Sequence, residues 1–221
     1  MGLHLVDVYK NPNIGLFLKA NDKVLLVPKG LAPTKCERFS RDLEVSLCPT
    51  SIGGSRLLGP LASMNGNGVL VSRMAEQQEV REIASSTGIN VARLESKYTA
   101  VGNLVAANDK RALVSPVLEA KAVSQVRDVL NTEVERASIR QYYQVGALVV
   151  ATNSGAAVFP ELDEPEVERI GSSLGVEAYP TPINGGVPFV ASGLVANTRN
   201  ALAGNQTTGP ELVFITRALK V

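Results

Sequence analysis

One short pattern recurs five times along the chain: a glycine, then a run of apolar residues, then an asparagine. The glycines that open the five copies are Gly15, Gly59, Gly102, Gly146 and Gly193. The steps between them are 44, 43, 44 and 47 residues, and together they fill the 221-residue chain. Because five near-equal steps in register indicate a repeated structural unit, the pattern predicts a repeat architecture.

The third copy indicates what one unit contains. Residues 102–107 predict a strand, Asn108 and Asp109 suit a tight hairpin turn, and residues 112–114 predict a second strand. Apolar residues at helical spacing predict a helix over residues 119–130, and residues 134–139 predict a third strand. Each unit is therefore predicted to be strand, strand, helix, strand.

Capping boxes mark the helix starts of other copies. Residues 34–37, 163–166 and 208–211 each place a cap residue three positions before a glutamate. The last of these predicts a helix over residues 212–219, although Val213-Phe214-Ile215 is also compatible with a strand. No segment remains after Val221 for the third strand of the fifth copy, and residues 3–8 are predicted to supply it.

These expectations combine into one α+β architecture. It is a five-bladed α-β propeller about a pseudo-fivefold axis, with the helices outside and the ring closed by the N-terminal strand. We expect residues 1–221 to form a single closed domain, because closure removes exposed sheet edges. The repeats are expected to begin near residues 14, 58, 101, 145 and 192, with residues 3–8 completing the last one.

Composition narrows the possible partners and compartment. The chain has 22 Lys+Arg against 21 Asp+Glu, whereas a protein held mainly by phosphate contacts is usually more basic. Its apolar runs are too short to span a bilayer, and its start does not resemble a signal peptide. The two cysteines, Cys36 and Cys48, make no disulfide framework. We expect a cytoplasmic, reduced, monomeric protein with no membrane partner.

The residues that carry most enzyme chemistry are scarce. The chain has one histidine, His4, on the predicted closing strand, while Cys36 falls in a predicted outer helix and Cys48 at a strand end. Nucleophilic catalysis needs a thiolate and a base within hydrogen-bond reach, and a metal site needs more ligands than these. The sequence therefore predicts no catalysis, metal, cofactor or small-molecule substrate.

Several segments carry a family resemblance. Residues 102–105, 108–109 and 112–116, followed by residues 132–134, resemble the translation initiation factor 6 family, as do residues 51–59 and 67–71 and the tail from Leu194 to Leu212. The resemblance implies the fivefold pentein fold. It also implies binding to the large ribosomal subunit, beside the sarcin–ricin loop and neighbouring ribosomal proteins, where the protein blocks joining of the small subunit. Because the chain stops just after its last predicted helix, it resembles the archaeal members. Arg199 and Pro60 depart from the residues common in eukaryotic members.

The resemblance also suggests site residues. Asn103 and Gly102 match positions at or beside the ribosome-facing surface, and Arg56 matches a basic residue of the family. The alternative for Asn103 is a local hydrogen bond to its own backbone. For Gly15, Gly59, Gly102, Gly146 and Gly193, the alternative to a flat docking face is crowding near the axis. Asn13, Asn65 and Asn197 are weaker candidates, because turn chemistry explains them.

The functional hypothesis is a non-catalytic factor that binds the large subunit mainly through ribosomal proteins, with a minor rRNA contact, and sterically prevents subunit association. A role in large-subunit biogenesis is an additional hypothesis. The alternatives are a divergent pentein enzyme that acts on guanidine groups and an interaction scaffold with no ribosomal role. The census of His4, Cys36 and Cys48 argues against the enzyme.

Overall fold

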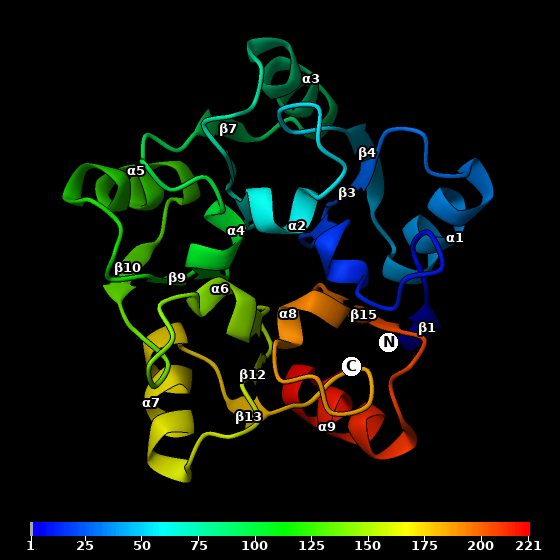
Figure 1. The fold of residues 1–221 in the computed structure, drawn as a ribbon, viewed down its shortest axis with the longest axis vertical. Helices are drawn as coiled ribbons and strands as arrows, with labels where there is room; N and C mark the ends of the chain where they lie inside the picture. The colour runs from blue at the N-terminus through cyan, green and yellow to red at the C-terminus, as the bar shows by residue number, and fades with distance from the viewer. Residues whose placement is uncertain (1) are drawn as a thin grey trace.

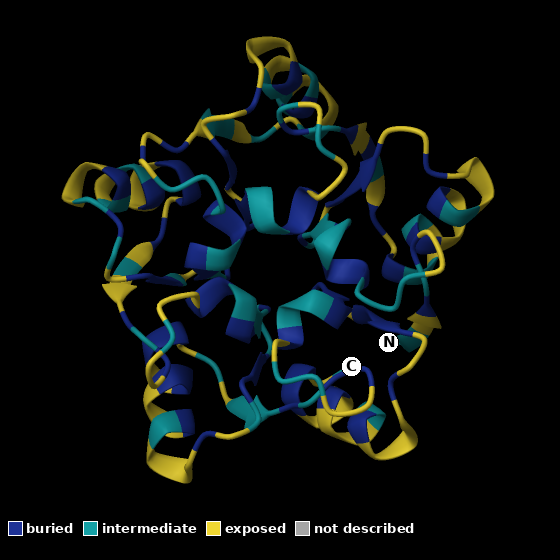
Figure 2. Ribbon diagram, in the orientation of Figure 1, coloured by how far each residue is buried: buried dark blue, intermediate teal, exposed yellow. Residues whose placement is uncertain are grey.

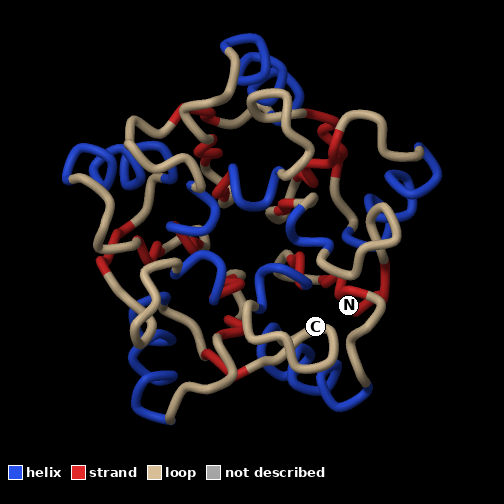
Figure 3. The backbone as a smooth tube through the Cα atoms, in the orientation of Figure 1, coloured by secondary structure: helices blue, strands red, loops and turns tan. Residues whose placement is uncertain are grey.

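The computed structural model describes residues 2–221 and contains five three-stranded sheets arranged around a common axis (Figure 1). Each sheet belongs to one repeated unit of about 44 residues. The longer helices lie on the outside of the molecule and five very short helices lie around its centre (Figure 3). This is a mixed α+β fold whose five small sheets fit the predicted fivefold repeat.

The five units have the same order of elements: a short inner helix, two strands, an outer helix and a third strand. The first unit contains η1 (Ile14–Leu16), β2 (Lys19–Ala20), β3 (Val24–Pro28), α1 (Pro33–Leu43) and β4 (Ser46–Thr50). The second contains α2 (Leu58–Leu61), β5 (Ala62–Met64), β6 (Gly68–Val71), α3 (Gln77–Thr87) and β7 (Asn90–Arg93). The third contains α4 (Val101–Leu104), β8 (Val105–Ala107), β9 (Arg111–Val114), α5 (Ala120–Leu130) and β10 (Glu133–Arg136). The fourth contains α6 (Val145–Leu148), β11 (Val149–Ala151), β12 (Ala156–Val158), α7 (Glu164–Leu174) and β13 (Ala178–Pro180). The fifth contains α8 (Val190–Gly193), β14 (Leu194–Ala196), β15 (Asn200–Gly204), α9 (Gly209–Leu219) and, from the chain start, β1 (Gly2–Val6).

Every sheet has the same pairing. The second strand of a unit is central, antiparallel to the first strand and parallel to the third, as β9 is to β8 and β10. The antiparallel pair is joined by a tight turn, whereas the parallel pair needs the outer helix as its crossover.

The N-terminal strand completes the fifth sheet. β1 runs parallel to β15, with Leu3 opposite Ala201 and Val6 opposite Gly204. β1 thus lies in the position where the sequence predicts the third strand of the last repeat. Because β1 and β15 share a sheet, the start of the chain is held to the fifth unit by backbone hydrogen bonds.

The core is divided among the units, and each sheet is buried on both faces. On β3, Leu25 and Val27 pack with Phe39 of α1 in the same unit, whereas Val24 and Leu26 pack against residues of the second unit. This alternation follows from the strand period of two. Adjacent units therefore share their apolar cores, and the exposed residues lie mainly on the outer helices and loops (Figure 2).

The structure corrects the beginning of every repeat. The strand predicted from Gly102 starts only at Val105, because Val101–Leu104 forms one helical turn. Val101 and Leu104 are three residues apart, so both point to the same side of that turn and are buried. A four-residue helix is too short to show a helical period, and in the sequence it looks like an extension of the following strand.

The helix caps are partly as predicted. Asp163 and Thr208 both form capping boxes, and the fifth outer helix is a helix rather than a strand. The capping box expected at Thr34 is wrong, because α1 begins at Pro33 after Ala32, which makes no side-chain cap bond. Proline is well suited to a first helical turn, and the helix starts at Pro33, two residues earlier than a cap at Thr34 would place it.

Candidate functional site

The five short inner helices form a ring. Along the chain, η1, α2, α4, α6 and α8 each contact the next, and α8 returns to η1 (Figure 3). A Cβ atom built on Gly59 would lie 1.7 Å from the carbonyl oxygen of Gly15, and one built on Gly102 would lie 1.9 Å from the oxygen of Gly59. Gly146 and Gly15 meet the oxygens of Gly102 and Ala191 at 2.2 and 1.9 Å. These four glycines are required by close backbone approach, so the steric explanation accounts for them.

The fifth glycine of the pattern is not equivalent to the others. In α8 the second helical position, which Gly102 occupies in α4, is held by Ala191. The spacing from Gly146 to Ala191 is 45 residues, closer to the other steps than the 47 residues to Gly193. A Cβ on Gly193 would instead meet the side chains of Asn184 and Ile183 at 2.5 and 2.7 Å. The expected equivalence of Gly193 with the other four glycines was wrong, because Ala191 occupies the corresponding position in α8.

The third residue of each ring helix lies beside a shallow central pocket of about 310 Å³. These residues are all partly exposed: Leu16, Pro60, Asn103, Ala147 and Ser192. Asn103 is the one with a side-chain amide. The local hydrogen bond considered as the alternative for this side chain is not formed within residues 2–221, where only its backbone N–H bonds to Ala100.

Exposed apolar side chains surround this ring, and the sequence pattern did not reveal them. Tyr9, Leu57, Tyr143 and Phe189 have exposed fractions of 40, 43, 52 and 39 %. Each lies in the loop that leads into a ring helix, and Leu57 and Phe189 are the residues directly before α2 and α8. The loops differ in length and composition, so a repeat search does not align these residues. We call these four side chains and the five third positions of the ring helices the ring face.

Arg56 and Asn13 also lie at the ring face. The guanidinium carbon of Arg56 is 5.7 Å from the ring centroid of Tyr9, a cation–π arrangement. The Asn13 side-chain oxygen accepts a hydrogen bond of 3.4 Å from the Ser192 hydroxyl. Both predicted residues are thus brought together with Asn103 at one end of the molecule.

The loop that carries Arg56 is held by an outer helix. The Glu79 carboxylate on α3 accepts hydrogen bonds from the backbone N–H groups of Gly53 and Gly54 at 2.7 and 3.0 Å. Burial alone would raise the pKa of the Glu79 carboxyl, but these bonds, with those from Ser51 and Glu76, lower it below its usual value. The ring-face loop is therefore fixed by charge-assisted hydrogen bonds.

Asn65 and Asn197 lie elsewhere. They occupy the hairpin turns, and their exposed fractions are 3 and 2 %. The Asn65 amide donates to the carbonyls of Asn108 and Leu130, and the Asn197 amide donates to that of Leu43. Turn and inter-unit bonding account for both residues, and we leave them out of the candidate interface.

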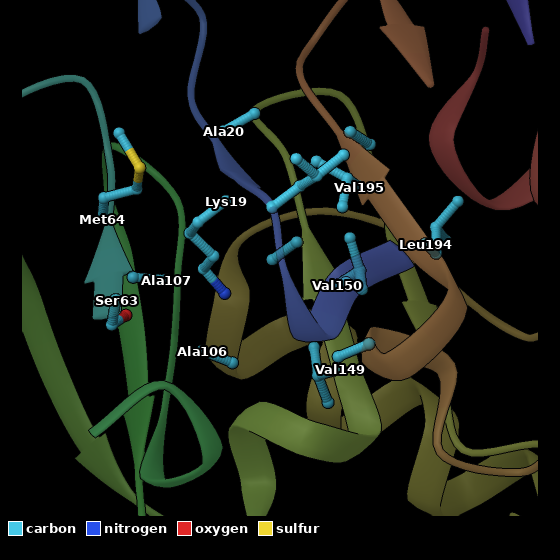
Figure 4. Close-up of a pocket in the computed structure, with 15 residues that line it drawn as sticks. Lys19, Ala20, Ser63, Met64, Ala106, Ala107, Val149, Val150, Leu194 and Val195 are labelled. Atoms are coloured by element: carbon cyan, nitrogen blue, oxygen red, sulfur yellow. The ribbon is translucent and has the colours of Figure 1, made fainter. Parts of the chain in front are cut away.

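A lysine on the central axis was also missed by sequence reasoning. Lys19, on β2, lines both the ring-face pocket and a narrower space of about 50 Å³ below it. Its side chain points into the space between Ala106 and Val149 (Figure 4). Removal from water lowers the pKa of Lys19 to about 8. A lone lysine within an apolar run has no sequence signal that distinguishes it from a surface charge.

The histidine and the two cysteines lie apart from one another in different elements. His4 lies on β1 with Nδ1 4.0 Å from Asp42. Cys36 and Cys48 are buried, and burial raises the pKa of both thiols. Among residues 2–221 no group of three or more His, Cys, Asp or Glu side chains is placed to hold a metal ion. No helix in that range is both long and apolar enough to cross a membrane.

Comparison with known proteins shows that this chain is similar to translation initiation factors and identifies its family. Proteins named Translation initiation factor 6 are similar to almost the whole chain: that of Cenarchaeum symbiosum is 40% identical over 218 residues, 99% of each chain, and that of Nitrosopumilus maritimus is 42% identical over 212 residues, 96% of each chain. The model described as the eIF-6 family matches residues 3–218, and the chain belongs to this family. Family and relatives together support a role in translation initiation.

A solved structure has a partial likeness. The N-terminal domain of ArgZ, covalently bound to a reaction intermediate, overlaps with a TM-score of 0.48 at 14% identity, covering 75% of this chain and 68% of that chain. At this TM-score the likeness carries no argument about fold or activity.

Proposed function

We propose that the protein binds the large ribosomal subunit through its ring face and sterically prevents the small subunit from joining. The observation that carries this proposal is the gathering of Tyr9, Leu57, Tyr143 and Phe189 around a ring whose five third positions are all uncharged. Exposed apolar side chains with aromatic anchors and few charges are typical of protein-docking surfaces. Asn103 and Arg56 supply polar contacts at the same face.

The fold supplies the rigidity that steric exclusion needs. We infer that the five sheets form one closed five-bladed propeller of the pentein type and that residues 1–221 are a single domain. The pairing of β1 with β15 and the return of α8 to η1 support this closure. A body whose blades share their cores resists deformation at its docking face.

The charge balance suits a partner that is mainly protein. With 22 basic and 21 acidic residues, the chain has little general attraction for phosphate, so we propose contact with ribosomal proteins near the sarcin–ricin loop and a minor contact with rRNA. A stable complex of this kind buries about 1,600 Å² in total. We propose that the protein is a cytoplasmic monomer that also serves in large-subunit biogenesis.

We further propose that the protein is not an enzyme. The Cys36 thiol is directed to the carbonyl of Leu31 at 3.8 Å rather than to a base. A raised thiol pKa lowers the fraction of reactive thiolate at neutral pH. Both observations support a binding role.

Cosedimentation with separated ribosomal subunits tests the proposal. The protein is expected to pellet with large subunits and to stay in the supernatant with small subunits. Preincubated with large subunits, it should reduce the amount of joined ribosome in a sucrose gradient. Equal pelleting with both subunits, or normal joining at saturating protein, would refute the proposal.

A further inference from the structure

The axis of the molecule contains a cavity that opens at the ring face. The outer part is the pocket of about 310 Å³, and the inner part is the space of about 50 Å³. Gly15, Lys19 and Ala191 line both parts, which places the two spaces against each other.

Lys19 is the one charged residue among those lining the two spaces. Within residues 2–221 its ammonium group makes neither an ion pair nor a hydrogen bond, and no carboxylate lines either space. Its pKa of about 8 leaves it mostly protonated at pH 7. An unpaired, partly buried cation is unfavourable, so an anion that reaches it gains a strong interaction.

Two acidic residues, Asp22 and Asp109, lie among the hairpin turns at the end of the axis away from the ring face, and their carboxylates already accept hydrogen bonds. Asp22 accepts hydrogen bonds from the Thr198 N–H and hydroxyl, both at 2.7 Å. Asp109 accepts from the Gly66 N–H at 2.6 Å, and the Asn153 amide donates to both carboxylates. These bonds hold the two carboxylates among the turn residues.

We propose that the ring-face cavity binds a small organic monocarboxylate, with its carboxylate on the Lys19 ammonium and its apolar body against Leu16, Pro60 and Phe189. One lysine matches one negative charge, whereas a phosphate dianion needs more donors than this apolar lining offers. The volume lies at the small end of the range for ligand pockets and suits a short chain. The rim amides of Asn103 and Asn13 lie where a polar substituent would meet them.

The ligand therefore occupies the centre of the ring face. Ligand binding at this site is a property separate from subunit docking, and it can be measured on the protein alone, without ribosomes. If both proposals hold, linkage requires that a bound acid and a docked subunit alter each other's affinity by the same factor.

The test titrates the full-length protein with acetate, butanoate and hexanoate at pH 7, by calorimetry and by amide chemical shifts. Hexanoate is expected to bind and to shift the amides of Gly15, Gly102 and Asn103 while leaving that of Gly66 unchanged. Affinity should rise along the series by up to about fourfold for each buried methylene. Hexanamide, which has the same shape without the charge, should bind at least about tenfold more weakly.

Two variants complete the test. Lys19→Met should abolish hexanoate binding, whereas Lys110→Met, which removes an exposed lysine, should leave it unchanged. Circular dichroism tests whether both variants are folded. If Lys19→Met does not fold, Lys19→Gln provides a second neutral replacement. Three results would each overturn the site. They are equal binding of hexanoate and hexanamide, retained hexanoate binding in the folded neutral variant, and no detectable hexanoate binding at about 50 mM. Failure here would leave the docking proposal standing, because no ribosomal subunit is present.

Discussion

The side-chain amide nitrogen of Asn65 lies 2.9 Å from the main-chain oxygen of Asn108, so one hairpin turn is bonded directly to the turn of the next unit. Asn21 bonds to Asn65 in the same way at 2.7 Å, and Asn108 bonds to Thr152 at 3.3 Å. The Asn108 amide also reaches the carbonyl of Leu174 at the end of an outer helix, as the Asn65 amide reaches that of Leu130. The turn asparagines therefore connect neighbouring units as well as shaping their own turns.

Replacing Asn65 by alanine should destabilise the protein strongly. The side chain is buried and makes four hydrogen bonds, two as donor and two as acceptor from Asn67 and Gly68. We expect a loss of about 2–4 kcal/mol of unfolding free energy, measured by urea denaturation. Asn90→Ala, at an exposed strand position, is the control and should change little. A loss below about 1 kcal/mol for Asn65→Ala would contradict the connector role.

Gly102→Ala tests the ring. The added methyl group would lie 1.9 Å from the carbonyl oxygen of Gly59 and 2.5 Å from that of Ala62, and backbone atoms cannot move aside cheaply. Unfolding free energy should fall by about 3 kcal/mol or more. Gly209→Ala is the matched control, because an added Cβ there meets nothing within 4 Å. Wild-type thermal stability in Gly102→Ala would show that the ring does not pack this closely.

Asn103→Lys separates docking from folding. The side chain is partly exposed at the ring-face pocket, so a longer cationic side chain has room to point outward. Binding to large subunits in the cosedimentation assay should weaken, while thermal unfolding stays nearly unchanged. A large fall in melting temperature would instead identify Asn103 as a structural residue.

Leu57→Glu tests the apolar part of the ring face. A carboxylate in place of an exposed anchor would have to be desolvated on docking, so affinity for large subunits should fall about tenfold or more. Val213→Glu is the control, because Val213 is also an exposed aliphatic residue, 66 % accessible, but lies on outer helix α9. Equal losses in the two variants would place the interface somewhere other than the ring face.

Lys19→Met should stabilise the protein at pH 7 by about 1 kcal/mol, since it removes an unpaired cation from an apolar space. The pKa of Lys19 falls from 10.5 to about 8 on folding, so between these values the unfolded chain binds more protons than the folded one. The free energy of unfolding of the wild type therefore rises with pH in this range. The difference in unfolding free energy between Lys19→Met and the wild type should shrink from pH 8 to pH 10. Urea denaturation at each pH measures the difference, with Lys110→Met as the exposed control. A constant or widening difference would argue against a charged Lys19 in the cavity.

Much of the fold could be predicted because its signals are local. The caps at Asp163 and Thr208 and the helical spacing over residues 119–130 depend on neighbours within one or two turns. The pairing of β1 with the fifth unit could be predicted from the number of strands in each copy, because the fifth copy lacked a third strand of its own. The inner helical turns were missed because four residues such as Val101–Leu104 carry too short a period.

The candidate site was less predictable. Asn103, Asn13 and Arg56 share one end of the molecule, whereas Asn65 and Asn197 are buried connectors. The repeat pattern did not predict Leu57 and Phe189 as ring-face residues, because the loops before the ring helices do not align between copies. Nothing in the sequence around Lys19 distinguishes a side chain on the axis from one on the surface.

By itself, the sequence determined the number of units, the order of the strands and outer helices within them and the source of the last strand, because repeat spacing, turn residues and caps act over short stretches of chain. Only the tertiary structure decided that Ala191 rather than Gly193 completes the ring, that the turn asparagines join neighbouring units, and that Lys19 points into a central cavity. Each of these depends on contacts between residues about 44 or more positions apart. Such contacts follow from the arrangement of the five units around a common axis, which a pattern along the chain does not encode.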